Sequence, residues 1–264
     1  DGRVLGLMAD GSIDAEIEVD VGMPDLACLD DGQFVAACDD GTVRVIHSGG
    51  VLPLHGGHND IANAVAVSME KKLVASAGAD HAILCWDLNL PGNDPFQFEG
   101  HKDSVSSVDW SNDILLTSSR DSRVCVWDSR MKPWQPVTRV KVGSMALTAA
   151  FGRSGERVLV ATEAMEIQGY DIRGGASMSA VWRERTRAPA TRIAECPQNP
   201  NIVAVATDAP SVMILQVDNG NEVQSPLVHH TDFVRGIAWD VQTRGKLFTG
   251  SWDKSVCEWQ VDVA

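Results

Sequence analysis

The chain has 264 residues, of which 44% are hydrophobic and 22% charged, and its formal net charge is −14. This length suffices for one large core, and no apolar run approaches the ~20 residues of a membrane-spanning helix. The excess of acidic residues argues against nucleic acid and anionic membranes as partners and favours basic protein segments.

Six cysteines are spread along the chain without a CxxC pair or a Cys/His cluster of zinc spacing. Six thiols in a chain of this length do not make a disulfide framework. We therefore expect reduced, mostly buried cysteines, no metal and no cofactor. Together with the lack of a charged and then apolar leader, this predicts a protein of the cytoplasm and nucleus.

In chain order, six segments repeat the same ending, in which an alternating apolar run stops just before a polar residue. The steps between these residues are 40 to 47 positions, and the residues are His47, Asp87, Asp128, Asp171, Asp218 and Gln260. Each unit has a first strand such as 105–110, a second such as 114–119, and a third such as 124–127 after a tight turn. Four short strands every forty-odd residues, with no helical stretch between them, predict a β-propeller.

The fold class is therefore all-β, as a single β-propeller domain over 1–264. Residues 4–20 look like the last two strands of a further unit, which gives a seven-bladed prediction with the first blade incomplete at the N-terminus. The expected blades are a partial one at 1–20 and then approximately 22–50, 55–97, 99–140, 142–183, 186–224 and 229–264.

Three units carry the same four polar or aromatic side chains. In each set a hydroxyl residue lies four positions before an Asp, and a Trp lies six positions after it. The sets are His58, Ser76, Asp80 and Trp86; His101, Thr117, Asp121 and Trp127; and His230, Thr249, Asp253 and Trp259. Imidazole, hydroxyl, carboxylate and indole groups are able to form a hydrogen-bonded chain inside a sheet. The fourth and fifth units have Ala164 and Ser211 at the Asp position, so apolar packing is expected to hold those blades.

These sets resemble the structural tetrads of the WD-repeat family. The resemblance implies that the four side chains bond to one another within a blade and that Asp253 belongs to the frame. No motif for nucleotide binding, hydrolysis or metal chemistry occurs in the chain. We therefore expect no catalytic residues and a noncatalytic, protein-binding role, since loops on a rigid scaffold commonly form binding surfaces.

In this family the turn before each tetrad Asp shares a face with the loop that carries the His. The partner-binding candidates on that face are Arg120, Trp252, Phe233, Arg235, Asp60, Asp103 and Asp232. An exposed Trp beside Phe and Arg has the composition of an interface anchor, although packing on a neighbouring blade is an equal alternative for Trp252. The three aspartates either attract a basic peptide or order their own loops.

Two stretches narrow the resemblance: residues 230–256, which include HTDFVRGIAW and GSWDKSV, and residues 127–136, WDSRMKPWQP. They are similar to the WD-repeat subunits of the methylosome, which partner the symmetric protein arginine methyltransferase. The resemblance implies a scaffold that helps present Arg-rich substrates such as histone tails and spliceosomal Sm-protein tails. An acidic surface suits this role because it raises the local concentration of basic tails.

One alternative belongs to another class of protein. The stretch 127–130 fits the WDxR pattern of propellers that deliver substrates to cullin-type ubiquitin ligases, and 170–173 is a looser copy. In those receptors the arginine contacts the adaptor, so Arg130 and Arg173 are the candidates here. A generic interaction scaffold with other partners is the remaining alternative.

Overall fold

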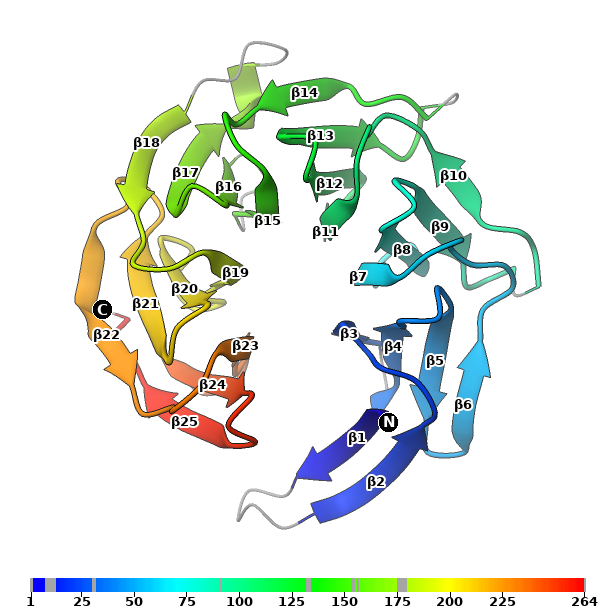
Figure 1. The fold of residues 1–264 in the computed structure, drawn as a ribbon, viewed down its shortest axis with the longest axis horizontal. Helices are drawn as coiled ribbons and strands as arrows, with labels where there is room; N and C mark the ends of the chain where they lie inside the picture. Colours follow the sequence, from blue (N-terminus) through cyan, green and yellow to red (C-terminus); the bar gives the residue numbers. More distant parts are fainter. Residues whose placement is uncertain are drawn as a thin grey trace.

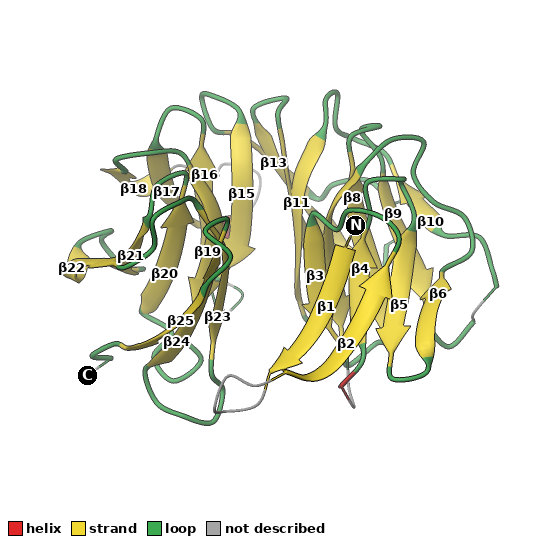
Figure 2. Cartoon of the chain, turned by 60° about the horizontal axis from the view of Figure 1, so that its bottom comes forward, coloured by secondary structure: helices red, strands yellow, loops and turns green. Residues whose placement is uncertain are grey.

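The computed structural model describes residues 2–7, 13–29, 32–90, 92–131, 134–152, 155, 157–174 and 180–263. The described chain consists of antiparallel sheets arranged around a central axis (Figure 1). In six of the sheets the strand that comes first in the chain lies nearest that axis, and Figure 2 shows several of these strands from the side. One short 3-10 helix, η2 (Ile172–Gly174), follows the third strand of the fourth sheet.

Six of the sheets are blades. The first five, numbered in chain order, have four strands each. The first blade contains β3 (Asp25–Cys28), β4 (Phe34–Ala37), β5 (Val43–His47) and β6 (Gly50–Pro53), and the second contains β7 (Ala62–Ser68), β8 (Leu73–Gly78), β9 (Ile83–Asp87) and β10 (Phe96–Phe98). The third contains β11 (Val105–Ser111), β12 (Ile114–Ser119), β13 (Arg123–Asp128) and β14 (Thr138–Lys141); the fourth β15 (Ala146–Phe151), β16 (Arg157–Thr162), β17 (Glu166–Asp171) and β18 (Ala180–Arg185); and the fifth β19 (Ala190–Glu195), β20 (Ile202–Thr207), β21 (Ser211–Gln216) and β22 (Glu222–Val228). The sixth has three: β23 (Val234–Trp239), β24 (Lys246–Ser251) and β25 (Val256–Gln260).

The prediction of seven blades is wrong, because the structure has six. Residues 1–20 were expected from the sequence to be a partial blade, but the described residues of this segment form a hairpin of β1 (Gly2–Leu7) and β2 (Ile13–Val19). Val19 of this hairpin is buried against Ala36, Cys38 and Ile46 of the first blade. The alternating pattern correctly indicates strands, but blade number depends on how sheets pack around the axis, which a local pattern does not encode.

Burial separates the sixth blade from its neighbours. The third strands β13, β17 and β21 are buried at their four central positions, as expected for a sheet covered on both faces. In β25 exposed and half-buried positions alternate instead. The sixth blade is therefore covered mainly on one face.

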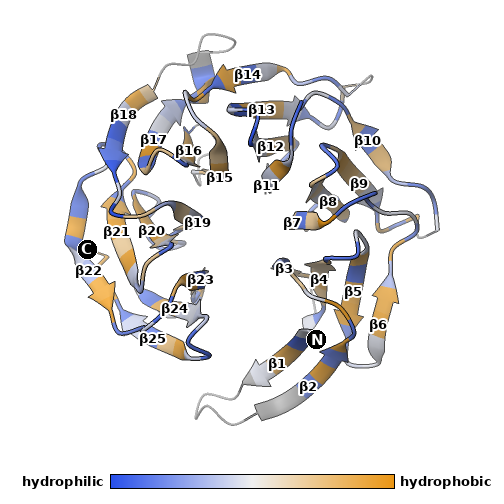
Figure 3. Ribbon diagram, in the orientation of Figure 1, coloured by the Kyte–Doolittle hydropathy of each residue, from blue (hydrophilic) through white to orange (hydrophobic). Residues whose placement is uncertain are grey.

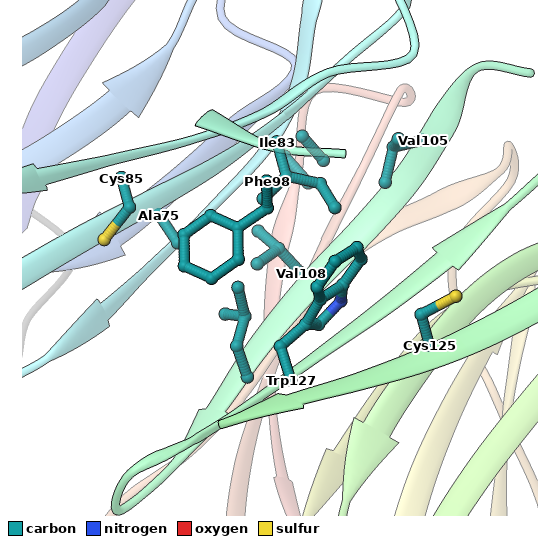
Figure 4. Close-up of a cluster of buried hydrophobic side chains, with 11 residues drawn as sticks. Ala75, Ile83, Cys85, Phe98, Val105, Val108, Cys125 and Trp127 are labelled. Carbon is teal, nitrogen blue, oxygen red and sulfur yellow. The ribbon is translucent and has the colours of Figure 1, made fainter. Parts of the chain in front are cut away.

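The core lies between blades. Phe98 at the edge of the second blade meets Trp127 of the third edge-on, with ring centroids 5.6 Å apart (Figure 4). Both side chains are almost fully buried, and burying a side chain of this kind contributes roughly 1.5–3 kcal/mol or more. Figure 3 shows hydrophobic residues concentrated on the strands and hydrophilic residues in the connecting loops.

The turns between second and third strands share one backbone feature. The residue after the turn aspartate has a positive φ in four blades, at Gly41, His81, Ser122 and Lys254. At Gly41 a Cβ atom would lie 2.5 Å from the carbonyl oxygen of His58, so this position requires glycine. The other three residues carry a side chain in the left-handed region, and the backbone N–H of each donates to the carbonyl of the residue three positions earlier in its turn.

Candidate functional site: the mouth of the central channel

The four side chains of the third blade lie together in one buried hydrogen-bonded chain. Trp127 donates its indole N–H to Thr117 Oγ1 at 2.9 Å, and the same oxygen lies 2.8 Å from His101 Nε2. His101 Nδ1 is 3.1 Å from a carboxylate oxygen of Asp121. Each group therefore has the partner that burial requires.

The sixth blade repeats this arrangement and the second blade varies it. His230 lies between Asp253 and Thr249 at 2.9 and 2.8 Å, and Trp259 donates to Thr249 at 2.8 Å.

In the second blade His58 lies between Asp80 and Ser76 at 2.9 and 2.6 Å. Here the indole of Trp86 donates to the backbone carbonyl of His55 at 2.7 Å, and not to the serine hydroxyl. A buried indole N–H needs an acceptor, and either oxygen supplies one.

The tetrad aspartates tie the turn between second and third strands to the histidine loop. Asp121 accepts the backbone N–H of Lys102 at 3.0 Å and that of Arg123 at 2.9 Å, in addition to the histidine. Asp253 accepts the N–H of Thr231 and of Ser255, both at 2.9 Å.

The hydrogen bond from the Ser255 hydroxyl is the leading cause of a strongly lowered pKa at Asp253. Burial lowers the pKa of His58 and of His101. Each group is fully engaged in its blade, which is the geometry of a frame.

The fourth blade has a different polar chain. Its Tyr170, at the tetrad Trp position, donates its hydroxyl to the buried amide of Gln168. The amide nitrogen Nε2 of Gln168 donates to Glu166 Oε2 at 3.0 Å and to the carbonyl of Val142 at 3.3 Å. Apolar packing alone was expected in the fourth and fifth blades, and this expectation missed the buried amide of the fourth. In the fifth blade the third strand β21 is buried and largely apolar, as expected.

A β-bulge interrupts the first strand of five blades near the same end. The pairing register shifts around one residue in each case: Asn63, Ser106, Leu147, Thr191 and Arg235. A bulge re-aims the side chain of the extra residue, and all five line one cavity of about 680 Å³. We call this cavity, together with Arg120 and Trp252 on its wall, the channel mouth.

Three bulge side chains fasten neighbouring blades at the channel mouth. Asn63 donates to the carbonyl of Val105 at 2.8 Å, and Ser106 donates to that of Ala146 at 2.7 Å. Thr191 makes a longer contact of 3.5 Å with the carbonyl of Val234. In each case the acceptor is the residue immediately before the next bulge.

Trp252, Phe233 and Arg235 form a stacked group at the channel mouth. The Arg235 guanidinium lies 4.6 Å from the Trp252 ring and 5.7 Å from the Phe233 ring, and the two rings are 5.6 Å apart. Trp252 nevertheless remains 59% exposed. An exposed tryptophan held rigidly by neighbours is suited to anchor a partner.

The three loop aspartates each bind their own backbone. Asp60, Asp103 and Asp232 accept the N–H of the following residue at 2.8, 2.7 and 2.8 Å. These bonds order the loops that precede the first strands. The carboxylates thus have an internal role besides any attraction they exert on basic groups.

Arg130 and Arg173 lie at the opposite end of their blades from Arg120, because Asp128 pairs with Ile114 at the far end of β12. Arg130 donates from Nε and Nη2 to Asp128 at 2.8 and 2.7 Å. Arg173 contacts Asp171 in the same way. Both arginines are about 60% exposed, but each is folded onto the aspartate two residues earlier.

Sequence reasoning did not find the bulges or the contacts inside the channel. Arg192 of β19 reaches Asp25 of β3 at 2.7 Å across the channel, although 167 positions separate them. The bulge residues recur every 41 to 44 positions, and this spacing was the one feature of the sequence from which they could have been predicted. Unlike the tetrad positions, however, the bulge positions hold a different residue type in each blade.

The described ranges contain no group of His, Cys, Asp and Glu side chains that could hold a metal ion. Nor does any helix in the described part of the chain have the length and apolarity to cross a membrane.

Curated proteins similar to this chain include the Xenopus laevis methylosome protein WDR77. It is 23% identical over 257 residues, an alignment that covers 92% of this chain and 74% of that protein. Periodic tryptophan protein 1 of Saccharomyces cerevisiae is 29% identical over 119 residues, covering 42% of this chain and 20% of that protein.

Two solved structures share the fold. The WD40 β-propeller domain of Doa1 matches with a TM-score of 0.79 and 18% identity, over 99% of this chain and 84% of that one. A chain of the mitotic checkpoint complex matches with a TM-score of 0.83 and 17% identity, over 98% of this chain and 81% of that one.

The family model "WD domain, G-beta repeat" matches residues 23–47, 51–87, 92–128 and 220–260, more than half of the chain. These segments include the three tetrads and the turns that carry them. The chain therefore belongs to the WD40 repeat family.

Proposed function

We propose that this chain is a noncatalytic scaffold that binds a partner protein at the channel mouth. The observation that carries the proposal is Trp252, which is exposed and stacked on Arg235 at the edge of a rigid frame. Large aromatic side chains held in one conformation lose little entropy on binding and often dominate interface energies. Acting as such a scaffold requires no reactive group.

The partner in this proposal is a protein arginine methyltransferase, and the scaffold helps present Arg-rich substrates such as histone and Sm-protein tails. Similarity to the methylosome protein across most of the chain supports this assignment. The net charge of −14 also favours encounter with basic tails. The complex would act in the cytoplasm and the nucleus.

Affinity purification of the tagged chain tests the proposal. Wild-type protein is expected to copurify the methyltransferase in stoichiometric amounts, and Trp252→Ala is expected to reduce its recovery several-fold. Val241→Ala is the matched control, because Val241 is also exposed but lies in the loop at the opposite end of the same blade. Equal recovery with Trp252→Ala and wild type would place the interface elsewhere.

The same experiment addresses the ubiquitin-ligase alternative. A ligase adaptor that is recovered with wild type and lost with Arg130→Ala would support that class of function. The guanidinium of Arg130 is already engaged by Asp128, so an adaptor would have to compete with this contact.

A further inference from the structure

We propose that the channel mouth binds an acidic segment of a protein partner, whose carboxylate or phosphate oxygens are received by Arg120 and Arg235. The inference rests on the proposed binding role of this face but not on the identity of the partner. An acidic ligand is the opposite of what the net charge of −14 would favour, because an acidic protein as a whole attracts basic ligands.

The charge of the cavity has the opposite sign to the charge of the protein. Arg120, Arg192 and Arg235 line it, and Asp208 is the one carboxylate among its described lining residues. Three guanidinium groups around one opening produce a local positive potential that an acidic side chain would meet at short range. At physiological ionic strength the Debye length is about 8 Å, so such local groups outweigh more distant carboxylates.

The three arginines are neutralised to different degrees. Arg192 has a direct contact of 2.7 Å with Asp25. Arg235 Nη2 lies 3.0 Å from Asp208 Oδ1, and 38% of the Arg235 side chain remains exposed. Within the same described residues the exposed Arg120 side chain has no ion pair or hydrogen bond. Arg120 and Arg235 are therefore the groups with capacity for a ligand.

The polar bulge residues do not compete for this role. Asn63 and Ser106 already donate to backbone carbonyls of the neighbouring blades. Because these donors are already in use, the guanidinium groups are the donors that would bind an anionic ligand.

Stacking prepares Arg235 for an anion. The Trp252 ring lies 4.6 Å from the guanidinium carbon, which restricts the guanidinium plane. A stacked guanidinium still presents N–H groups at its edge, and their fork geometry matches the two oxygens of a carboxylate or phosphate. This geometry favours an anionic oxygen group over a cation or an uncharged side chain.

Fluorescence anisotropy with labelled peptides on the purified full chain tests the proposal. Three peptides share one Gly/Ser backbone and carry glutamate, phosphoserine or glutamine at the same positions. The variants are Arg120→Gln and Arg235→Gln, with Arg130→Gln on the opposite face as control. Thermal melts of all variants verify that the fold is retained, and Arg120→Gln removes no described contact of the folded chain.

The glutamate or the phosphoserine peptide is expected to bind wild type more tightly than the glutamine peptide, and the tighter of the two identifies the anionic group. Arg120→Gln and Arg235→Gln should each weaken this binding about tenfold, as for the loss of one charge-assisted hydrogen bond, and Arg130→Gln should not change it. Equal binding of all three peptides, no binding of either acidic peptide, or an equal loss with Arg130→Gln would overturn the proposal. Copurification of the methyltransferase tests the identity of the partner separately, so a failure of that assignment can be distinguished from a failure of the acidic-ligand proposal.

Discussion

Replacing Asp121 with alanine removes the carboxylate that joins two loops of the third blade. The side chain is 6% exposed and accepts three hydrogen bonds: from His101 at 3.1 Å, from the Lys102 N–H at 3.0 Å and from the Arg123 N–H at 2.9 Å. The histidine side chain behind it has no exposed surface. The substitution therefore leaves the buried His101 Nδ1 and the partly buried Arg123 N–H without their acceptor, whereas the Lys102 N–H lies in an exposed loop.

The expected loss of stability follows from these contacts. At a net ~1 kcal/mol per hydrogen bond, three bonds correspond to about 3 kcal/mol, and unsatisfied buried donors raise the loss toward roughly 5 kcal/mol. For a domain of this size each kcal/mol lowers Tm by about 2–4 °C, so the smaller loss corresponds to a fall of roughly 6–12 °C.

Urea unfolding monitored by circular dichroism measures the change, and Asp103→Ala is the matched control. Asp103 lies in the adjoining loop of the same blade but accepts one backbone N–H, that of Ser104. Its replacement should lower the free energy of unfolding by about 1 kcal/mol or less. If the two variants differed by less than about 1 kcal/mol, the tetrad aspartate would not have the structural role assigned to it.

Three further predictions use the same frame. Thr117→Val should destabilise the chain by about 1 kcal/mol more than Ser76→Ala. The Thr117 hydroxyl bonds both His101 and Trp127, whereas the Ser76 hydroxyl bonds only His58, because the indole of Trp86 donates to the His55 carbonyl instead. Equal urea midpoints for the two variants would contradict this difference. Trp252→Ala should leave Tm nearly unchanged, because the indole is 59% exposed, while it weakens one partner; a melting loss as large as that of Asp253→Ala would show that Trp252 is part of the frame. Stability should fall as the pH is lowered from about 7.5 to 5.5, because burial lowers the pKa of His58 and His101 and the unfolded chain takes up protons below the ordinary histidine pKa of ~6.5; a urea midpoint that rises or stays constant over this range would refute that sign.

Much of the local structure could be predicted from residue spacing. The four-residue and six-residue intervals around Asp121 place a hydroxyl and an indole on facing strands of one hairpin, and Thr117 pairs opposite Cys125, two residues from Trp127. Such short intervals act within one sheet, where the pleat determines which side chains share a face. Strand positions and tetrads are therefore readable from the chain.

The channel mouth was only partly predictable. Trp252, Phe233 and Arg235 were expected on one face because their turns and loops share one end of a blade. The bulges were not expected, since a bulge depends on the pairing of two strands and a different residue type occupies it in each blade.

By itself, then, the sequence determined the all-β class, the repeat and the hydrogen-bonded frame of three blades, because these depend on neighbours within a hairpin. Only the tertiary structure decided that there are six blades, that β1 and β2 pack on the first blade, and that arginines gather at the mouth of an acidic protein. Those features depend on contacts between sheets around the axis, such as that of Arg192 with Asp25, and no local spacing encodes them.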